Sequence, residues 1–213
     1  MVTDLGACVG GIDEAGRGAL LGPLVVAGVA VDEDSLVRLK SFGVRDSKQL
    51  SPRRREQLYP LIREAARKVS VIEISPHEID VRGKRGINLN ELELQKMAQI
   101  AESLGCETVY VDAVDTDEQR FGAMLSKRVP GIRFVSEHRA DEVYVVTGAA
   151  SIVAKVTRDA RIRELQGVYG PLGSGYPSDP RTTEFVKRYY ITEGRLPDFV
   201  RSTWKTVAKL KLK

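Results

Sequence analysis

The first third of the chain contains three stretches whose apolar positions are spaced as in β-strands. Residues Ala7–Asp13 and Pro23–Val31 are short apolar runs joined by a glycine-rich turn, and Lys68–Ser75 alternates apolar with polar side chains. Short apolar runs bounded by turn residues are typical of buried strands, and alternation has the period of a strand. We therefore expect three strands here, followed by further strands at Thr108–Asp112 and Ile132–Val135.

Apolar positions at helical spacing predict helices in most of the remaining chain. One helix begins between the second and third strands, where Ser51 can cap it and Pro52 occupies its first position. The other segments with this spacing are Asn88–Leu104, about Asp117–Arg128, Asp141–Gln166, Arg181–Tyr190 and Thr203–Lys211.

Strands and helices in this order predict an α/β fold, with a central mixed sheet covered by helices on both faces. The small residues of Gly148–Ser151 would let the long helix lie close against that sheet. The glycine- and proline-rich segment Pro171–Pro180 is expected to be a loop that separates the long helix from the helices after it. We therefore place a domain boundary near residue 170, with a main domain over 1–170 and a small helical segment over 171–213 that packs on it.

Basic side chains gather towards the C-terminus. The net charge of +4 alone favours polyanionic partners only weakly. From Arg181 to Lys213, however, the sequence contains nine Lys and Arg residues and only three Asp and Glu residues. Five basic residues follow the last acid of the chain: Arg201, Lys205, Lys209, Lys211 and Lys213. Two interpretations stay open for them, contacts along a phosphate backbone and a solvated surface.

The two cysteines, Cys8 and Cys106, are far apart in the sequence. This spacing gives no disulfide framework and fits a reducing compartment. The isolated His77 and His138 do not form a zinc-binding pattern. No stretch reaches the ~18 apolar residues of a membrane span, and no leader pattern precedes the first strand. We expect a cytoplasmic monomer that does not bind membranes.

Four carboxylates end or adjoin apolar segments that lie far apart in the sequence: Asp13, Glu14, Asp112 and Asp141. Asp13 is expected as the last residue of its strand, and Asp141 at the start of a helix, whose dipole would keep it ionised. Carboxylates brought together by folding repel one another, and hard divalent cations prefer such oxygen ligands. Two metal ions held this way can hydrolyse phosphodiesters. Alternatively, each acid only marks the end of a strand or helix.

The Gly16-Arg17-Gly18 segment is not a nucleotide-binding loop. The next glycine, Gly22, falls one position too late for G-x-G-x-x-G, and a strand follows where a helix would be needed. We therefore expect no nucleotide cofactor. The glycines either form a tight turn between strands or allow a ligand to approach the backbone closely.

Several segments together resemble one family. They are Asp13-Glu14-Ala15-Gly16-Arg17-Gly18, Asp46-Ser47-Lys48, Ala140-Asp141, Ala149–Val156 (A-A-S-I-V-A-K-V) and Gly173–Thr182 (G-S-G-Y-P-S-D-P-R-T). In this order and spacing the chain resembles a type 2 ribonuclease H (ribonuclease HII), and is most similar to the archaeal branch. The resemblance runs from about Gly10 to about Thr206 and implies a ribonuclease H-like fold.

The resemblance also implies roles for individual residues. Asp13, Glu14, Asp112 and Asp141 would be the catalytic acids of a two-metal Mg²⁺ or Mn²⁺ site. The main chain of Gly16, Arg17 and Gly18 would contact the ribose 2′-hydroxyl, the group that distinguishes RNA from DNA. Tyr176 would sense the RNA–DNA junction. The segment over 171–213 would bind substrate. From the residues themselves, two interpretations stay open for Lys48 and Lys155, a phosphate contact and a solvated surface lysine, and Arg181 is interpreted as a nonspecific contact with the phosphate backbone.

These expectations describe a metal-dependent endoribonuclease that cleaves the RNA strand of RNA–DNA hybrids. It would also nick DNA duplexes at embedded ribonucleotides, leaving 3′-hydroxyl and 5′-phosphate ends. A type 3 ribonuclease H is the nearest alternative, but that class typically has a lysine in the G-x-G loop, where this chain has Arg17. A resolvase-like, structure-specific DNA nuclease on the same fold would ignore the 2′-hydroxyl. A non-enzymatic nucleic-acid-binding module would leave the clustered acids unexplained.

Overall fold

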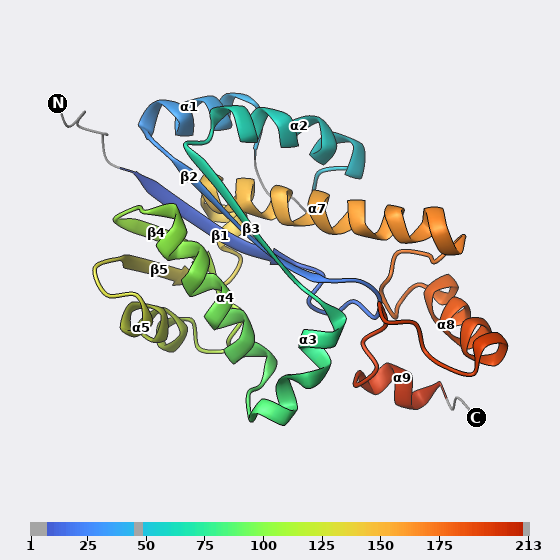
Figure 1. Cartoon of the computed structure of the whole chain (residues 1–213). Helices are drawn as coiled ribbons and strands as arrows, with labels where there is room; N and C mark the ends of the chain where they lie inside the picture. The colour runs from blue at the N-terminus through green and yellow to red at the C-terminus, as the bar shows by residue number, and fades with distance from the viewer. Residues whose placement is uncertain (1–7, 45–48, 211–213) are drawn as a thin grey trace. The chain divides into compact units, whose positions relative to one another are not determined.

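Five apolar segments of the chain form one mixed sheet in the order β3-β2-β1-β4-β5. The computed structural model describes residues 8–44 and 49–210. The strands, which Figure 1 labels, are β1 Val9–Ala15, β2 Leu24–Val31, β3 Lys68–Ile74, β4 Thr108–Asp112 and β5 Arg133–Glu137. β4 pairs in parallel with both β1 and β5. All of β2 is buried, as expected for its uninterrupted apolar sequence.

The five predicted strands are therefore present; β4 has the predicted ends, and the ends of the other four differ from those predicted. β1 continues through Ala15. The prediction that Asp13 is the last strand residue was wrong, because the backbone keeps its extended pairing geometry until the turn at Gly16, which has a φ of 87°. Asp13 consequently lies inside a strand, with its carboxylate on one face of the sheet.

Helices cover both faces of the sheet. A Cβ atom at Gly10 would contact the side chains of Leu104 and Val109. A Cβ atom at Gly11 would instead clash with the backbone of Val146 and Thr147. Because neighbouring strand residues point to opposite faces, the helices that carry Leu104 and Val146 lie on opposite sides of β1. The helices are α1 Glu33–Ser41, α2 Pro52–Ala65, α3 Pro76–Val81, η2 Arg82–Arg85, α4 Leu89–Leu104, α5 Glu118–Arg128, α6 Ala140–Val143, α7 Val145–Tyr169, α8 Pro180–Glu193 and α9 Lys205–Lys209.

Local signals explain where several helices begin. The Ser51 hydroxyl accepts the N–H of Arg54, and Pro52 follows as the first residue of α2, as predicted. Asp117 caps α5 in the same way through the N–H of Arg120. Helices α1, α3 and η2 were not predicted; α1 is capped by Asp32, whose carboxylate accepts the N–H of Ser35.

The single long helix predicted from residue 141 to 166 is two helices. Tyr144 has an extended conformation, with φ −105° and ψ 117°, and separates the four-residue α6 from α7. Its ring lies 4.2 Å from that of Tyr110, and its hydroxyl donates to Glu137. Asp141 therefore belongs to the short helix α6 and does not begin the long one.

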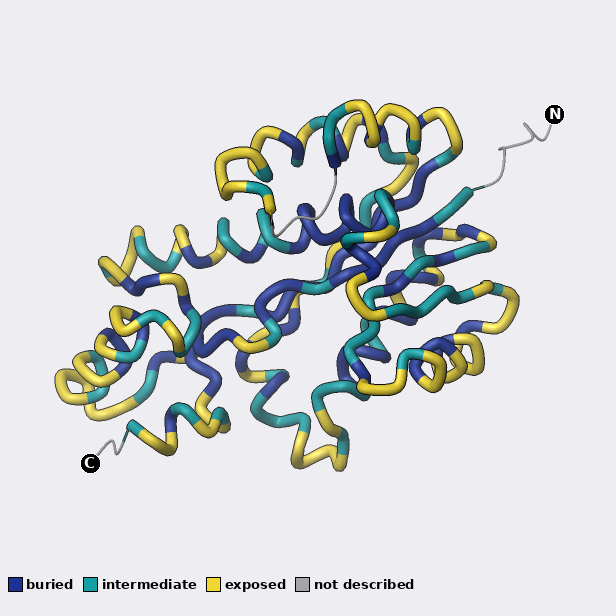
Figure 2. Tube along the Cα trace, turned by 180° about the vertical axis from the view of Figure 1, so that it is seen from behind, coloured by how far each residue is buried: buried dark blue, intermediate teal, exposed yellow. Residues whose placement is uncertain are grey.

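The chain divides into two compact units. One comprises the residues up to Glu14, Val26–Ile72 and Asn90–Val156, and the other Ala15–Val25, Glu73–Leu89 and Thr157 onwards. The second unit has its own apolar core, which includes Leu172, Phe185 and Val186. Strands β1 and β2 are mostly buried, whereas β3 and β5 are mostly half-buried or exposed. In Figure 2 the helices carry buried residues on one side and exposed residues on the other. The domain boundary near residue 170 stays a prediction.

Cys8 and Cys106 form a disulfide, so the expectation of no disulfide was wrong. Val9 is paired with Thr108 in the parallel register of β1 and β4, so Cys8, one residue before β1, and Cys106, two residues before β4, lie at the same end of the strand pair. The Cα atoms of the cysteines are 4.9 Å apart although 98 positions separate them in the sequence. The contact depends on strand pairing, which cysteine spacing does not reveal.

Within the part of the chain that the structure describes, no helix has the length and apolar character needed to span a membrane.

Candidate active site

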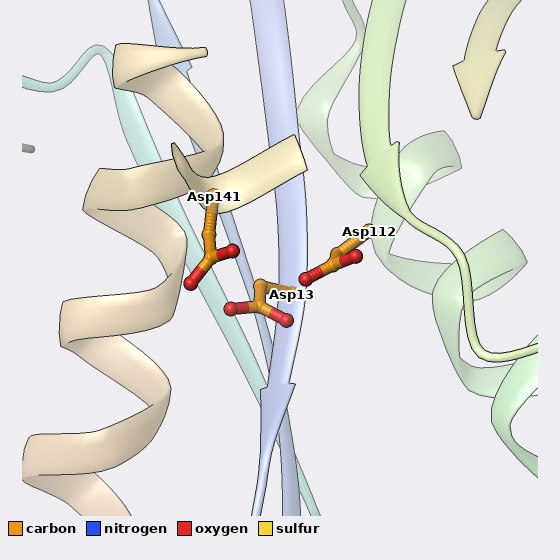
Figure 3. A group of neighbouring side chains, drawn as sticks. All are labelled: Asp13, Asp112 and Asp141. Carbon is orange, nitrogen blue, oxygen red and sulfur yellow. The ribbon is translucent and has the colours of Figure 1, made fainter. Parts of the chain in front are cut away.

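Three aspartates from different elements meet beside β1. Asp13 lies on β1, Asp112 ends β4, and Asp141 belongs to α6. One carboxylate oxygen of each lies within 4.8 Å of the others, and Figure 3 shows the three side chains turned towards one another. The parallel register pairs Ile12 with Val111, so the residues that follow them, Asp13 and Asp112, are neighbours across the sheet.

The backbone holds these carboxylates in place. Asp112 accepts a hydrogen bond from the backbone N–H of Arg139 at 2.9 Å. Arg139 has a left-handed φ of 61°, which is uncommon for residues other than glycine, asparagine or aspartate. Asp13 accepts the N–H of Glu14 at 2.7 Å. Gly11 lets the first turn of α7 approach the strand at a distance that no side chain would permit. The site therefore depends on main-chain geometry as well as on its acids.

Burial makes the negative charge of Asp13 costly. Its side chain is only 3% exposed, and this burial raises the pKa of the carboxyl group above its ordinary value. Lys155 and a hydrogen bond with Ser151 oppose that rise, while the nearby Asp141 reinforces it. The ammonium of Lys155 donates to the Ser151 hydroxyl at 2.5 Å. One cation from the protein thus lies close to a group of acids that repel one another.

The donor set fits a hard divalent cation. All three converging groups are carboxylates, and Mg²⁺ and similar ions prefer oxygen ligands at about 2.0–2.6 Å. Ligand oxygens on one such ion lie within roughly twice that distance of each other, which the 4.8 Å limit on the three aspartates satisfies. A nearby Lys155 alone leaves the group net negative, and a divalent ion would offset the remaining repulsion.

Glu14, the fourth predicted acid, is not a member of this group of three described residues. It follows Asp13 within β1, and adjacent strand residues point to opposite faces. The strand would have had to end at Asp13 for both side chains to turn the same way. The role of Glu14 as a metal ligand stays a prediction.

The predicted glycine loop is a tight turn directly after β1. The N–H of Ala19 donates to the carbonyl of Gly16 at 3.1 Å. A Cβ atom at Gly16 would lie 2.9 Å from the carbonyl oxygen of Pro23, so this glycine is required by packing. Gly18 is exposed, and nothing lies within 4 Å of the Cβ position there. Packing therefore explains the first glycine of the loop but not the second.

Tyr176 lies half-buried in its loop, and its ring stacks on a cation. The guanidinium carbon of Arg158 is 4.4 Å from the ring centroid. Arg181, a predicted phosphate contact, is 74% exposed and forms two bonds to the carboxylate of Asp179, at 3.1 and 2.9 Å. Asp179 raises the pKa of this arginine. Of the other two predicted contacts, Lys155 lies beside Asp13, and Lys48 lies outside the described residues.

Sequence reasoning missed two buried arginines. Arg158 is 4% exposed and occupies the buried stripe of α7 between Ala154 and Ile162, so a charge in an apolar stripe was the available signal. Arg201 is fully buried and donates to the carbonyl oxygens of Arg17, at 2.9 Å, and Gly22, at 3.2 Å. Neither interpretation left open for Arg201, a phosphate contact or a solvated surface residue, fits this structure, because no part of the side chain reaches solvent.

Comparisons with known proteins agree with the fold. A family model described as Ribonuclease HII matches residues 10–207. The ribonuclease HII of Thermococcus sibiricus is 44% identical over 208 residues, which are 96% of this chain and 92% of that protein.

Two solved structures have the same architecture. The ribonuclease H2 of Pyrococcus horikoshii OT3 superposes with a TM-score of 0.89 at 42% identity, covering 96% of this chain and 97% of that one. The ribonuclease HII of Archaeoglobus fulgidus, solved in a complex with PCNA, gives 0.87 at 46% identity with the same coverage. The ribonuclease H-like fold expected from the sequence is confirmed. The chain belongs to the ribonuclease HII family and is an enzyme of the ribonuclease H class.

Proposed function

We propose that this enzyme is a metal-dependent endonuclease that cuts at ribonucleotides, both in RNA–DNA hybrids and where single ribonucleotides are embedded in duplex DNA. The products would carry 3′-hydroxyl and 5′-phosphate ends. Activity on hybrids follows from the family. The observation that supports the metal requirement is the convergence of three carboxylates within 4.8 Å, two of them almost fully buried.

Asp13, Asp112 and Asp141 would hold Mg²⁺ or Mn²⁺, with Glu14 as a further ligand. Bound divalent ions supply Lewis acidity and lower the pKa of water, and two of them can serve both the attacking and the leaving oxygen. The protein contributes the positions of its oxygens. Lys155 and Ser151 favour the ionised form of Asp13 and so keep it ready as a ligand.

The backbone of Gly16, Arg17 and Gly18 is proposed to read the ribose 2′-hydroxyl. Gly18 supports this role because its Cβ position is open and no positive φ restricts it. An alanine there is accommodated by the free protein, so it would obstruct only a ligand that approaches the backbone. Tyr176 is proposed to stack on the sugar or base at the junction, a contact typically worth ~1–3 kcal/mol. Lys48 and Arg181 are proposed to contact phosphates.

The test uses three labelled substrates: an RNA–DNA hybrid, a DNA duplex with one ribonucleotide, and the same duplex made entirely of DNA. Each is incubated with Mg²⁺, Mn²⁺ or EDTA, and the ends of the products are identified. We expect cleavage of the first two only, with either metal, and none with EDTA. Equal cutting of the all-DNA duplex would instead favour the resolvase-like alternative.

Matched variants separate the metal site from general damage. Asp13→Asn should reduce turnover by orders of magnitude and preserve folding, whereas Asp34→Asn, on the exposed side of α1, should leave turnover unchanged. Gly18→Ala should keep the wild-type melting temperature and lose cleavage at single ribonucleotides. Wild-type turnover by Asp13→Asn at saturating Mn²⁺ would contradict the proposed metal site.

We further propose that the enzyme acts as a monomer and needs no nucleotide cofactor. Sedimentation of the protein with and without substrate would test the first statement, and cleavage in the absence of any added nucleotide would test the second.

A further inference from the structure

A buried arginine links three segments of the second compact unit. Arg158 lies on α7, and its guanidinium stacks on the ring of Tyr176 at 4.4 Å. Its Nη2 atom donates to the carbonyl oxygen of Ser174 at 2.7 Å, two residues before the tyrosine. Its Nη1 atom forms an ion pair with Asp159 at 3.1 Å. The same side chain therefore contacts both the Tyr176 ring and the backbone of the loop Pro171–Pro180, which we call the tyrosine loop.

Two glycines pack against this arginine. A Cβ atom at Gly175 would lie 2.6 Å from its Nη2 atom, and a Cβ atom at Gly16 would lie 3.3 Å from its Cγ atom. Both glycines have positive φ, 82° and 87°. The turn after β1 and the tyrosine loop are thus fitted to opposite parts of the Arg158 side chain, so a change in its shape affects both.

The position carries a cost that packing alone does not explain. A guanidinium that is 4% exposed must be satisfied by hydrogen bonds or destabilise the fold. The Nε atom of Arg158 is buried and has no hydrogen-bond partner among the described residues. An apolar side chain of similar length would fill the space without that cost. An apolar side chain could not, however, stack a planar cation on the Tyr176 ring and donate a hydrogen bond to the backbone of the same loop.

We propose that Arg158 is a positioning residue for ribonucleotide recognition. It fixes the ring plane of Tyr176 and the backbone of the Gly16 turn, so that both substrate contacts are preformed before binding. This inference rests on the proposed function, in which those two elements contact the ribonucleotide. Arg158 is buried, so it acts through Tyr176 and does not itself touch the substrate.

A double-mutant cycle tests the coupling. Arg158→Met, Tyr176→Ala and the double variant are compared with wild type for cleavage of the duplex with one ribonucleotide, with KM and kcat measured separately. A stacked cation is worth about 0.5–2 kcal/mol, which corresponds to roughly 2–30-fold in kcat/KM. We expect Arg158→Met to lose activity in that range, mainly through KM. In the Tyr176→Ala background the same change should cost less than about twofold, because the ring it positions is gone.

Two further variants serve as controls. Arg161→Met removes an arginine one turn along α7 that is 46% exposed and paired with Glu73 and Glu164, and it should leave KM unchanged. Arg158→Lys keeps the charge and loses the planar fork, so KM should fall between wild type and Arg158→Met. If Arg158→Met does not fold, as judged by its melting temperature, the cycle is run with Arg158→Lys.

The outcomes distinguish failure of the proposed function from failure of the inference about Arg158. If the wild-type enzyme cuts no ribonucleotide-containing substrate, the proposed function fails. If it does cut, but the two substitutions reduce kcat/KM independently and their effects multiply, Arg158 is a structural residue only and the inference is overturned. A Tyr176→Ala variant with wild-type KM would overturn it as well.

Discussion

Replacing Gly11 with alanine should push helix α7 away from the sheet and disturb the aspartate group. Gly11 precedes Asp13 by two residues on β1, so both face the same side of the strand. A Cβ atom at Gly11 would lie 2.4 Å from the carbonyl carbon of Val146 and 2.5 Å from the amide nitrogen of Thr147. These are backbone atoms of the first turn of α7, and no rotamer change can move them aside.

The size of the effect follows from the distances. Ordinary contact begins near 3.4 Å, so the helix or the strand must retreat by about 1 Å. Overpacking of this kind typically costs ~1–3 kcal/mol, and we expect the upper part of that range because the obstacle is backbone. α7 also carries Ser151 and Lys155, which partly offset the effect of burial on the pKa of Asp13. A misplacement of ~1 Å at a catalytic centre can reduce turnover about 100-fold.

Gly10→Ala is the matched control on the same strand. A Cβ atom there would lie 3.0 Å from Leu104 Cδ1 and 3.1 Å from Val109 Cγ2, which are ends of side chains that can shift. Thermal unfolding, Mn²⁺ binding by calorimetry and hybrid cleavage are measured for both variants. We expect Gly11→Ala to lose stability, Mn²⁺ affinity and activity, and Gly10→Ala to lose a little stability only. Wild-type Mn²⁺ affinity in Gly11→Ala would refute the reasoning.

Three further predictions follow from other contacts. Cys8→Ser opens a disulfide that joins residues 98 positions apart, and should lower the free energy of unfolding by ~2–5 kcal/mol; two free thiols in the wild-type protein under non-reducing mass spectrometry would contradict it. Hydrogen bonds from the backbone N–H of Asp117 and from the Arg120 side chain lower the pKa of the buried Asp115 from 3.8 to about 2, so its ionised form stabilises the fold above about pH 4. That contribution, about 2 kcal/mol, should be lost as the pH falls through about 2, and urea unfolding between about pH 5 and 2 should show a smaller loss for Asp115→Asn. Arg201→Met leaves buried carbonyls without their donor and should cost at least ~2 kcal/mol, whereas Lys209→Met, at an exposed position, should change the melting temperature little; equal melting temperatures would show that Arg201 contributes no stability.

The periodic pattern was sufficient for the strands, most helices and three converging acids. Each strand is a separate apolar or alternating stretch, and Asp13 and Asp112 are recognisable because each is a charge at the end of an apolar run. Parallel pairing then brings the two together without any further information. For these features local sequence and global fold agree, which is why pattern reasoning succeeded.

Features that depend on contacts between distant residues were not accessible in the same way. The break between α6 and α7 has no glycine or proline to announce it, and it exists because Tyr144 packs on Tyr110 and bonds to Glu137. The disulfide depends on strand register. Arg201 resembles the other basic residues of the C-terminal segment in sequence, and only the folded chain shows that it donates to the carbonyl oxygens of Arg17 and Gly22.

The aspartate group is held together by the backbone around it, against its own charge. Asp13 and Asp141 are almost fully buried, and the charge of Asp141 makes ionisation of Asp13 less favourable. Attraction among the side chains therefore cannot be what assembles them. The β1–β4 register, the closeness of α7 at Gly11 and the N–H of Arg139 towards Asp112 impose the positions instead. A site built in this way is strained electrostatically until a cation binds. Replacing one of these aspartates with asparagine should consequently leave the fold intact while abolishing the function of the site.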